Sequence, residues 1–160
     1  MKKLKGLSLF ITVMAVLFPS ISLGQHAHGQ GSSGGGMKMD TREVLVEGVK
    51  VTFQIMPNDE HRKMLKEMKM KDDVESGTTH NITVLLKDEK SQKEITDAAV
   101  SMKLVEPKGK DQIKSLKYES SMKSYDGYFN LGERGSYQIL ILFRSGEQKR
   151  TAGINYDYNG

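Results

Sequence analysis

Residues 61–71, "HRKMLKEMKMK", place one histidine and three methionines within a single short segment. At 100° per residue, His61, Met64, Leu65 and Met68 fall within one helical stripe about 100° wide. A thioether is a soft, neutral ligand that prefers Cu(I), and an imidazole accepts several metals. The stripe therefore has two interpretations: a Cu(I) site, or the buried face of an ordinary amphipathic helix that is filled by adaptable methionines.

Three further residues could add ligands. His80 opens an alternating segment in phase with Ile82 and Val84, so it is either a ligand or an ordinary histidine at a sheet edge. Met122 lies in the loop "YESSMKSYDG", where a role in the core is harder to argue, and Met70 falls on the opposite side of the helix, among charged residues. The candidate metal ligands are His61, Met64, Met68 and His80, with Met122 and Met70 in reserve.

The sequence contains no cysteine. This excludes thiolate metal sites, a cysteine nucleophile and a lipoprotein anchor, so a transition metal would depend on His, Met, Asp or Glu. The motifs G-x-S-x-G and H-E-x-x-H are absent, and no Gly-rich loop joins a strand to a helix. We therefore expect a protein that binds without catalysing a reaction.

The first 24 residues have the layout of a secretory signal peptide. A lysine-rich start precedes an apolar run over residues 7–18, and Ser22 and Gly24 are small residues at the −3 and −1 positions before Gln25. A retained anchor is the alternative, but the run is short beside the roughly 20 residues that a membrane helix needs. We expect an exported, periplasmic protein that does not insert into the membrane after cleavage.

Charge and composition divide the remaining chain. The whole sequence has 24 basic and 20 acidic residues, and loss of the three lysines in residues 1–24 would reduce the net charge from +4 to +1. The charges are mixed along the chain and form no basic block, which excludes nucleic acid as a partner. Residues 25–40 are rich in Gly and Ser and are predicted to form a flexible tail. Residues 41–160 would then form one domain.

Strand signals dominate that domain. Segments such as "VKVTFQI" and "GSYQILILF" alternate apolar and polar residues, and turn signals follow every 8–14 residues. One helix, at about residues 58–71, interrupts them, and residues 113–118 are predicted to form a single weaker strand. Strands so close in sequence must pair antiparallel. The pattern predicts an immunoglobulin-like antiparallel β-sandwich of seven to eight strands with one inserted helix.

Residues 78–158 resemble the YtkA-like exported immunoglobulin-like domains. The matching stretches are "TDAAV" at Thr96–Val100, "PKG" at Pro107–Gly109 and "GSY" at Gly135–Tyr137. These are structural residues, so the resemblance implies the fold above all. Such domains often occur near heavy-metal efflux and copper-handling genes, which favours a metal without assigning a ligand. The methionine-rich helix lies outside the matched part.

Two functional hypotheses follow. The first is an exported carrier or buffer of Cu(I) that uses Met and His ligands and passes the ion to a membrane metal exporter or another envelope protein. The second is a non-catalytic immunoglobulin-like interaction module that docks on an envelope or transporter partner. Geometry discriminates between them. A helical stripe facing His80 across an open cleft would favour metal, and a solvent-exposed His61 beside buried methionines would favour the module.

Overall fold

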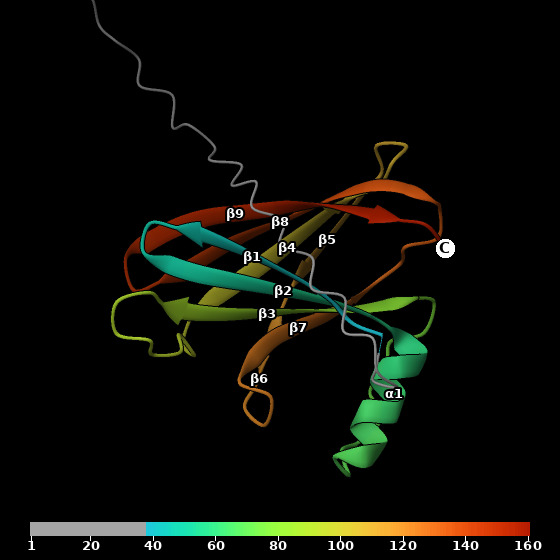
Figure 1. Ribbon diagram of the computed structural model, residues 1–160, viewed down its shortest axis with the longest axis horizontal. Coiled ribbons are helices and arrows are strands. Elements are labelled where there is room, and N and C mark those ends of the chain that lie inside the picture. The colour runs from blue at the N-terminus through green and yellow to red at the C-terminus, as the bar shows by residue number, and fades with distance from the viewer. Residues whose placement is uncertain (1–37) are drawn as a thin grey trace, which may run out of the picture.

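The structure, a computed structural model, describes residues 38–160, which form nine strands and one helix (Figure 1). The first sheet has the order β1-β2-β3-β7-β6, with β1 Asp40–Val46, β2 Val49–Pro57, β3 His80–Asp88, β7 Ser124–Phe129 and β6 Lys117–Glu119. The second has the order β5-β4-β8-β9, with β5 Asp111–Ser115, β4 Ala99–Val105, β8 Gly135–Ser145 and β9 Gln148–Tyr158. The helix α1, Asn58–Glu67, follows β2. The predicted signal peptide, residues 1–24, and nearly all of the predicted tail lie outside the described residues.

All neighbouring strands pair antiparallel, which confirms the predicted immunoglobulin-like β-sandwich. Alternate residues of β2 and β8 point into the core between the sheets, as the period of two requires. Burying each large apolar side chain there contributes about 1.5–3 kcal/mol. The largest of the fully buried side chains include Phe53, Tyr125, Phe129, Tyr137 and Phe143.

A tyrosine in β8 fixes the corner that precedes this strand. The Tyr137 hydroxyl donates a hydrogen bond to the Glu133 carbonyl at 2.8 Å and accepts one from the Glu133 amide at 3.1 Å. A hydroxyl that bonds back to the backbone a few residues upstream is the tyrosine corner of immunoglobulin-like folds. It holds this turn in a core that contains no disulfide.

The strand count is nine because residues 111–119 divide between the two sheets. β5 pairs with β4 in the second sheet, whereas β6 pairs with β7 in the first. Leu116 lies between them, is buried, and donates its amide to the Val100 carbonyl at 2.9 Å. The prediction of one strand over residues 113–118 was wrong, because apolar alternation alone does not show where a strand leaves one sheet for the other.

The helix is shorter than predicted, ending at Glu67 rather than near residue 71. Lys69 has a φ of 56°, in the left-handed region, and the Met70 amide bonds to the Leu65 carbonyl at 2.8 Å. This is a Schellman-type helix end. It could not be predicted from the sequence, because the left-handed position is a lysine and not the usual Gly or Asn. No helix within residues 38–160 has the length and apolar character that crossing a membrane requires.

Candidate metal centre

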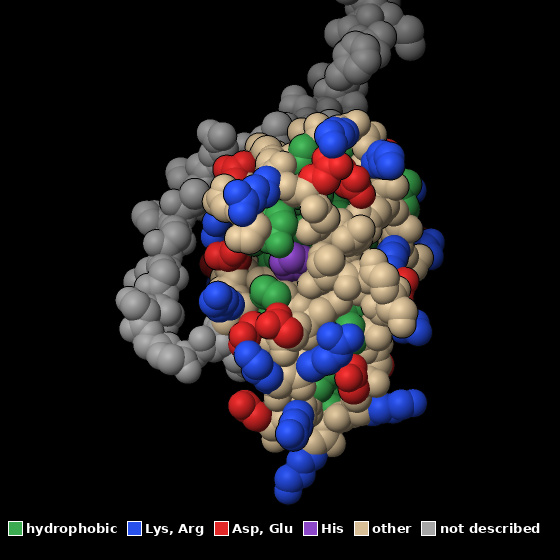
Figure 2. Space-filling view, turned by 90° about the vertical axis from the view of Figure 1, so that its right-hand side faces the viewer, with side chains coloured by type: hydrophobic (Ala, Val, Ile, Leu, Met, Phe, Trp, Pro, Cys, Tyr) green, Lys and Arg blue, Asp and Glu red, His purple; other side chains and the backbone are tan. Residues whose placement is uncertain are grey.

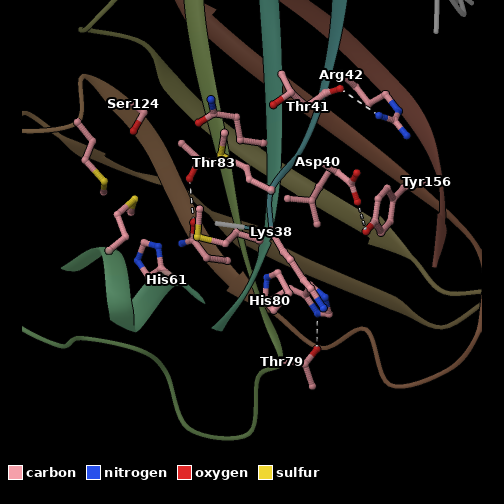
Figure 3. Close-up of a pocket in the computed structure, with 18 of the residues that line it drawn as sticks. Lys38, Asp40, Thr41, Arg42, His61, Thr79, His80, Thr83, Ser124 and Tyr156 are labelled. Atoms are coloured by element: carbon pink, nitrogen blue, oxygen red, sulfur yellow. Dashed lines mark hydrogen bonds between the residues drawn. The ribbon is translucent and has the colours of Figure 1, made fainter. Parts of the chain in front are cut away.

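A cleft of about 1260 Å³ opens at the end of the sandwich where α1 lies. Its walls come from α1, β1, the end of β2, the first half of β3, the start of β7, and the C-terminal part of β9 (Figure 3). Five of the six candidate ligands line it, and Met39 and Met56 line it as well. The five are His61, Met64, Met68, His80 and Met122.

Met70 lies apart from the cleft. Its Sδ accepts a hydrogen bond from the Ser121 hydroxyl at 3.6 Å, and it follows the left-handed turn that ends the helix. Met70 therefore connects the end of α1 to the β6–β7 loop.

The two histidines reach the cleft from opposite faces of the first sheet. His80 pairs with Pro57 and is in phase with Ile82, whose side chain is in the core, so His80 points into the space between the sheets. Met56 pairs with Asn81, one residue further on, and so points to the outer face, where α1 lies. The cleft consequently has an outer part with His61 and an inner part with His80.

His61 is buried without a hydrogen-bonding partner. Its side chain is 1% exposed, and neither Nδ1 nor Nε2 has a partner among residues 38–160. Its only ring contact there is edge-on with Tyr128, at 5.6 Å between centroids. A neutral imidazole carries one donor and one acceptor, and leaving a buried polar group unpaired costs about 1–3 kcal/mol. Because nearly all buried polar groups in proteins have a partner, the unpaired imidazole makes His61 a candidate ligand.

Burial lowers the pKa of His61 below its usual value of 6.5, although the nearby Asp73 and Asp72 carboxylates act in the opposite direction. The ring is therefore neutral near pH 7. Neutral imidazole is the form that binds a metal ion. Figure 3 shows the ring projecting from α1 into the cleft, with methionine sulfur atoms in the same region of the view.

The thioethers on this outer part come from three separate elements. Met56, from β2, is 4% exposed and Met64, from α1, is half-buried. Met122, from the β6–β7 loop, is also half-buried, whereas Met68, at the end of α1, is 45% exposed. Soft ligands converging from a strand, a helix and a loop would surround a Cu(I) ion without any carboxylate.

His80 occupies a more satisfied environment. Its Nδ1 lies 2.8 Å from the Thr79 hydroxyl, and its ring meets the Tyr158 ring edge-on at 5.1 Å. Nearby, the Tyr156 hydroxyl donates to the Asp40 carboxylate at 2.9 Å. Burial lowers the pKa of His80, and the Asp59 and Asp40 carboxylates partly offset that effect. These contacts would also serve an ordinary structural histidine.

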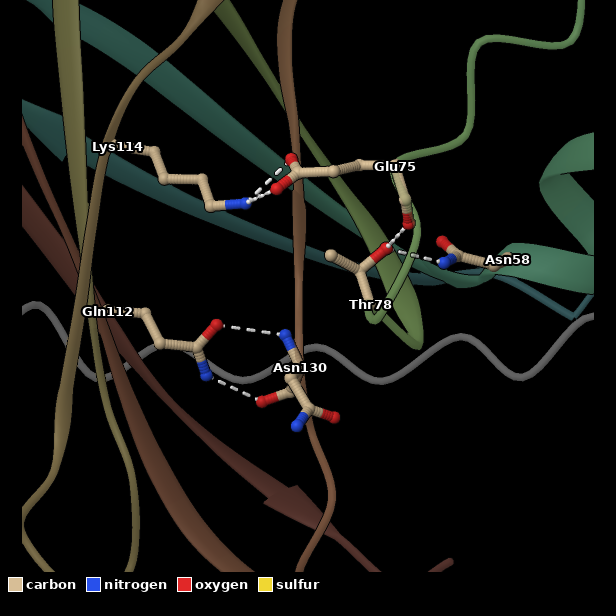
Figure 4. Close-up of polar contacts among 6 residues, drawn as sticks. All are labelled: Asn58, Glu75, Thr78, Gln112, Lys114 and Asn130. Carbon is tan, nitrogen blue, oxygen red and sulfur yellow. Dashed lines mark hydrogen bonds and ion pairs between the residues drawn. The ribbon is translucent and has the colours of Figure 1, made fainter.

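Polar contacts hold α1 in place over the sheet (Figure 4). The Asn58 amide donates to the Thr79 carbonyl at 2.9 Å, and its side chain donates to the Thr78 hydroxyl at 2.9 Å. Lys114 of β5 pairs with Glu75 at 2.7 Å, which ties the segment after the helix to the second sheet. These contacts fix the start of α1, which carries His61, and the segment that follows the helix.

The floor beside His61 is polar. Ser124 is fully buried and its Oγ has no hydrogen-bond partner among the described residues. Asp126, two residues along the same face of β7, has its pKa raised to about 6 by burial and by the neighbouring Asp73 carboxylate. Within residues 38–160, no three or more His, Asp or Glu side chains are grouped as metal ligands.

Met56 is the member of this cluster that sequence reasoning missed. It ends the alternating strand "VKVTFQIM", directly before Pro57, and falls out of phase with the core residues Phe53 and Ile55. The sequence does contain a signal, because Met56 is an apolar residue in the polar phase of its strand. Such a residue indicates that something covers the outer face.

The end of the molecule that carries the cleft is mixed in charge. Figure 2 shows a histidine in a hollow between hydrophobic side chains, with basic and acidic groups interspersed around it. The hollow is thus open to solvent at this end and has no single dominant charge.

Comparisons with known proteins support the fold. No protein-family model matches the chain, and no curated protein matches it. A DUF4426 family protein from Pseudomonas aeruginosa PAO1 is structurally similar, with a TM-score of 0.54, 15% identity, and coverage of 74% of this chain and 94% of that one. A copper-bound variant of FetP from uropathogenic Escherichia coli strain F11 has a TM-score of 0.59 and 12% identity, over 77% and 99% of the chains.

As-isolated FetP from the same strain, recombinantly expressed in the periplasm, gives a TM-score of 0.58 and 11% identity, over 77% and 97% of the chains. At these identities the likeness concerns the sandwich architecture alone. The chain belongs with these domains in fold, and the resemblance to YtkA-like domains is not confirmed.

Proposed function

We propose that this protein is an exported Cu(I)-binding protein, a carrier or buffer that acts in the periplasm without catalysis. The observation that carries the proposal is His61, whose two ring nitrogens are buried and unpaired in a cleft lined by Met56, Met64 and Met122. A neutral imidazole beside several thioethers is a ligand set suited to Cu(I). Met68 would complete the set from the end of α1.

The comparisons and the leader sequence add support. FetP, which shares the fold, has a copper-bound structure, and YtkA-like kinship would favour copper handling as well. The signal-like residues 1–24 favour export, where copper must be held without cytoplasmic thiols. A membrane metal exporter or another envelope protein would be the donor or acceptor of the ion.

The proposed site differs from the sequence-based set in its use of His80. His80 lies on the inner face of β3, beside Tyr158 and Thr79, whereas His61 and the methionines of the proposed set lie on the outer side of the sheet. His80 and the Asp40 carboxylate would line the inner part of the cleft without binding the ion.

The test is a competition for Cu(I) between the purified mature protein and a chromogenic chelator. The double change Met64→Leu with Met68→Leu should abolish or sharply weaken binding, because leucine offers no lone pair. It should alter the free energy of unfolding by less than about 1.5 kcal/mol, because the two side chains are similar in volume and both apolar.

Met102→Leu is the matched control. Met102 lies fully buried in β4, in the core between the sheets, so the same substitution there should leave the Cu(I) affinity unchanged. A wild-type protein that cannot compete with the chelator, or a double variant with unchanged affinity, would refute the proposal.

The interaction module remains the second candidate, on one specific observation. Ile113 and Leu142, on the outer face of the second sheet, are 69% and 41% exposed. Their strands, β5 and β8, flank β4 in that sheet, and exposed apolar side chains on one face can mark a contact surface. A protein that binds an envelope partner, loses that binding on Ile113→Lys, and never binds Cu(I) would favour this candidate.

A further inference from the structure

The methionines of the cleft differ in how far a second molecule can reach them. Met56 is 4% exposed, Met64 is half-buried, and Met68 is 45% exposed. Met68 caps the end of α1, and its amide bonds to the Met64 carbonyl at 3.0 Å, one turn back along the helix. The thioethers therefore become more exposed in order, from Met56 on β2, through Met64 on α1, to Met68 at the end of the helix.

This difference in exposure separates the residues that hold the ion from the residue at which it can be transferred. His61 is 1% exposed and cannot be touched by another protein, whereas Met68 can. Releasing Cu(I) into water would require all its bonds to break before new ones form. If the ion moves towards Met68, an acceptor can bind it there while it is still held by the protein. The ligands are then exchanged one at a time, and Cu(I) is never released into water.

Three exposed basic residues lie close to Met68 in the chain, with one exposed acidic residue, Glu67, directly before it. Lys66, Lys69 and Lys71 are exposed, and none of them forms an ion pair within residues 38–160. By contrast, the first turns of the helix are compensated, since Arg62 pairs with Asp72 at 3.3 Å and Lys63 with Glu60 at 2.8 Å. Positive charge at the exposed thioether would attract an acidic partner and repel a basic one.

Resting on the proposed function, we infer that Met68 and the three lysines form a handover surface for an acidic protein segment that bears thioether or thiolate ligands. A sulfur lone pair of the acceptor forms a bond to Cu(I) while the ion is still bound by Met68. The bond to Met68 then breaks, followed by the bonds to Met64 and His61. Copper remains Cu(I) throughout, and a thiol acceptor releases its proton to water.

The experiment measures Cu(I) transfer by stopped flow, from the loaded mature protein to two synthetic peptides. Both peptides carry the same methionine ligands, but one is flanked by glutamates and the other by lysines. At low salt the acidic peptide should receive copper at least about tenfold faster, as expected for electrostatic steering. The advantage should shrink as salt screens the charges.

Two variants with matched controls locate the surface. Met68→Leu should slow transfer at least roughly tenfold, a larger factor than the loss of equilibrium affinity expected from one exposed ligand, because the buried ligands remain. Met70→Leu, at the same helix end but outside the cleft, should leave the rate unchanged. Lys66→Glu with Lys69→Glu should reverse the preference between peptides, whereas Lys90→Glu with Lys93→Glu, in the β3–β4 connection at the opposite end of the sandwich (Figure 1), should not.

An unchanged transfer rate in Met68→Leu, or equal rates for the two peptides, would overturn the inference. Binding to anionic phosphatidylglycerol vesicles that depends on the same lysines, with no peptide preference, would assign the basic surface to a membrane and would overturn it too. A protein that fails to bind Cu(I) refutes the proposed function. A protein that binds Cu(I) but shows an unchanged rate in Met68→Leu, or equal rates for the two peptides, refutes only the handover surface.

Discussion

The two buried histidines provide a pair of identical substitutions with opposite expected effects on stability. His61→Leu removes a side chain whose two nitrogens are unpaired, whereas His80→Leu removes one that hydrogen-bonds to Thr79 at 2.8 Å. An unpaired buried polar group costs about 1–3 kcal/mol, and a hydrogen bond contributes about 0.5–1.5 kcal/mol net.

For His61→Leu, the relief of unpaired nitrogens is offset by loss of the edge contact with Tyr128, an interaction of about 0.5–1.5 kcal/mol. We expect the metal-free protein to gain about 1–2 kcal/mol, which corresponds to a rise of roughly 3–8 °C in melting temperature for a domain of this size. His80→Leu loses both its hydrogen bond and its contact with Tyr158, so we expect a loss of about 1–2 kcal/mol.

The assay is denaturant unfolding of chelator-treated protein at pH 8, followed by Cu(I) competition on the same samples. At pH 5.5 the advantage of His61→Leu over wild type should widen. The pKa of His61 is lowered in the folded protein, so the unfolded chain takes up a proton near pH 6.5 that the native protein does not, and wild type loses stability. If His61→Leu destabilises as much as His80→Leu, then His61 is an ordinary structural residue and our reasoning is refuted.

Two further predictions concern the sheets. Asp126→Asn should stabilise the protein by about 1–2 kcal/mol at pH 8, because burial raises the pKa of this carboxyl from 3.8 to about 6 and the charged form is penalised above that pH, although solvent screens part of the penalty at this half-buried position. The gain should disappear below about pH 4, where the carboxyl is protonated in both the folded and the unfolded state. Unfolding curves at the two pH values test this, and an equal gain at both would contradict the prediction. Tyr137→Phe should cost about 1–3 kcal/mol by removing both bonds of the hydroxyl to Glu133, and a loss under about 0.5 kcal/mol in thermal unfolding would contradict the role of this corner.

The sandwich was predictable because its strands follow a period of two. Each face-in residue of β2 and β8 lies in the core, and the Glu47-Gly48 turn, with φ values of 46° and 75°, separates β1 from β2 as a tight hairpin requires. The division of residues 111–119 between two sheets was not predictable. Both alternatives bury alternate side chains, and only tertiary pairing chooses between them.

The site was predictable in part. Helical spacing placed His61 and Met64 on one face, because the period of 3.6 is a local property. The relation between that face and the sheet is a tertiary property. It decides that Met56 joins His61 on the outer side while His80, one pairing position away, turns to the inner side. The periodicity of a single sequence does not show how a helix packs on its sheet.

The packing beneath α1 departs from that of the core between the sheets. Where the sheets face each other, the largest fully buried side chains are apolar or, like Tyr137, have a bonded hydroxyl. Beneath α1, in contrast, His61 and Ser124 are buried with unpaired polar atoms in one cleft. Folding alone would favour leucine at position 61, since Leu65 on the same helical face is buried without cost. We propose that the chain keeps an imidazole there, among thioethers, for what its nitrogens can bind.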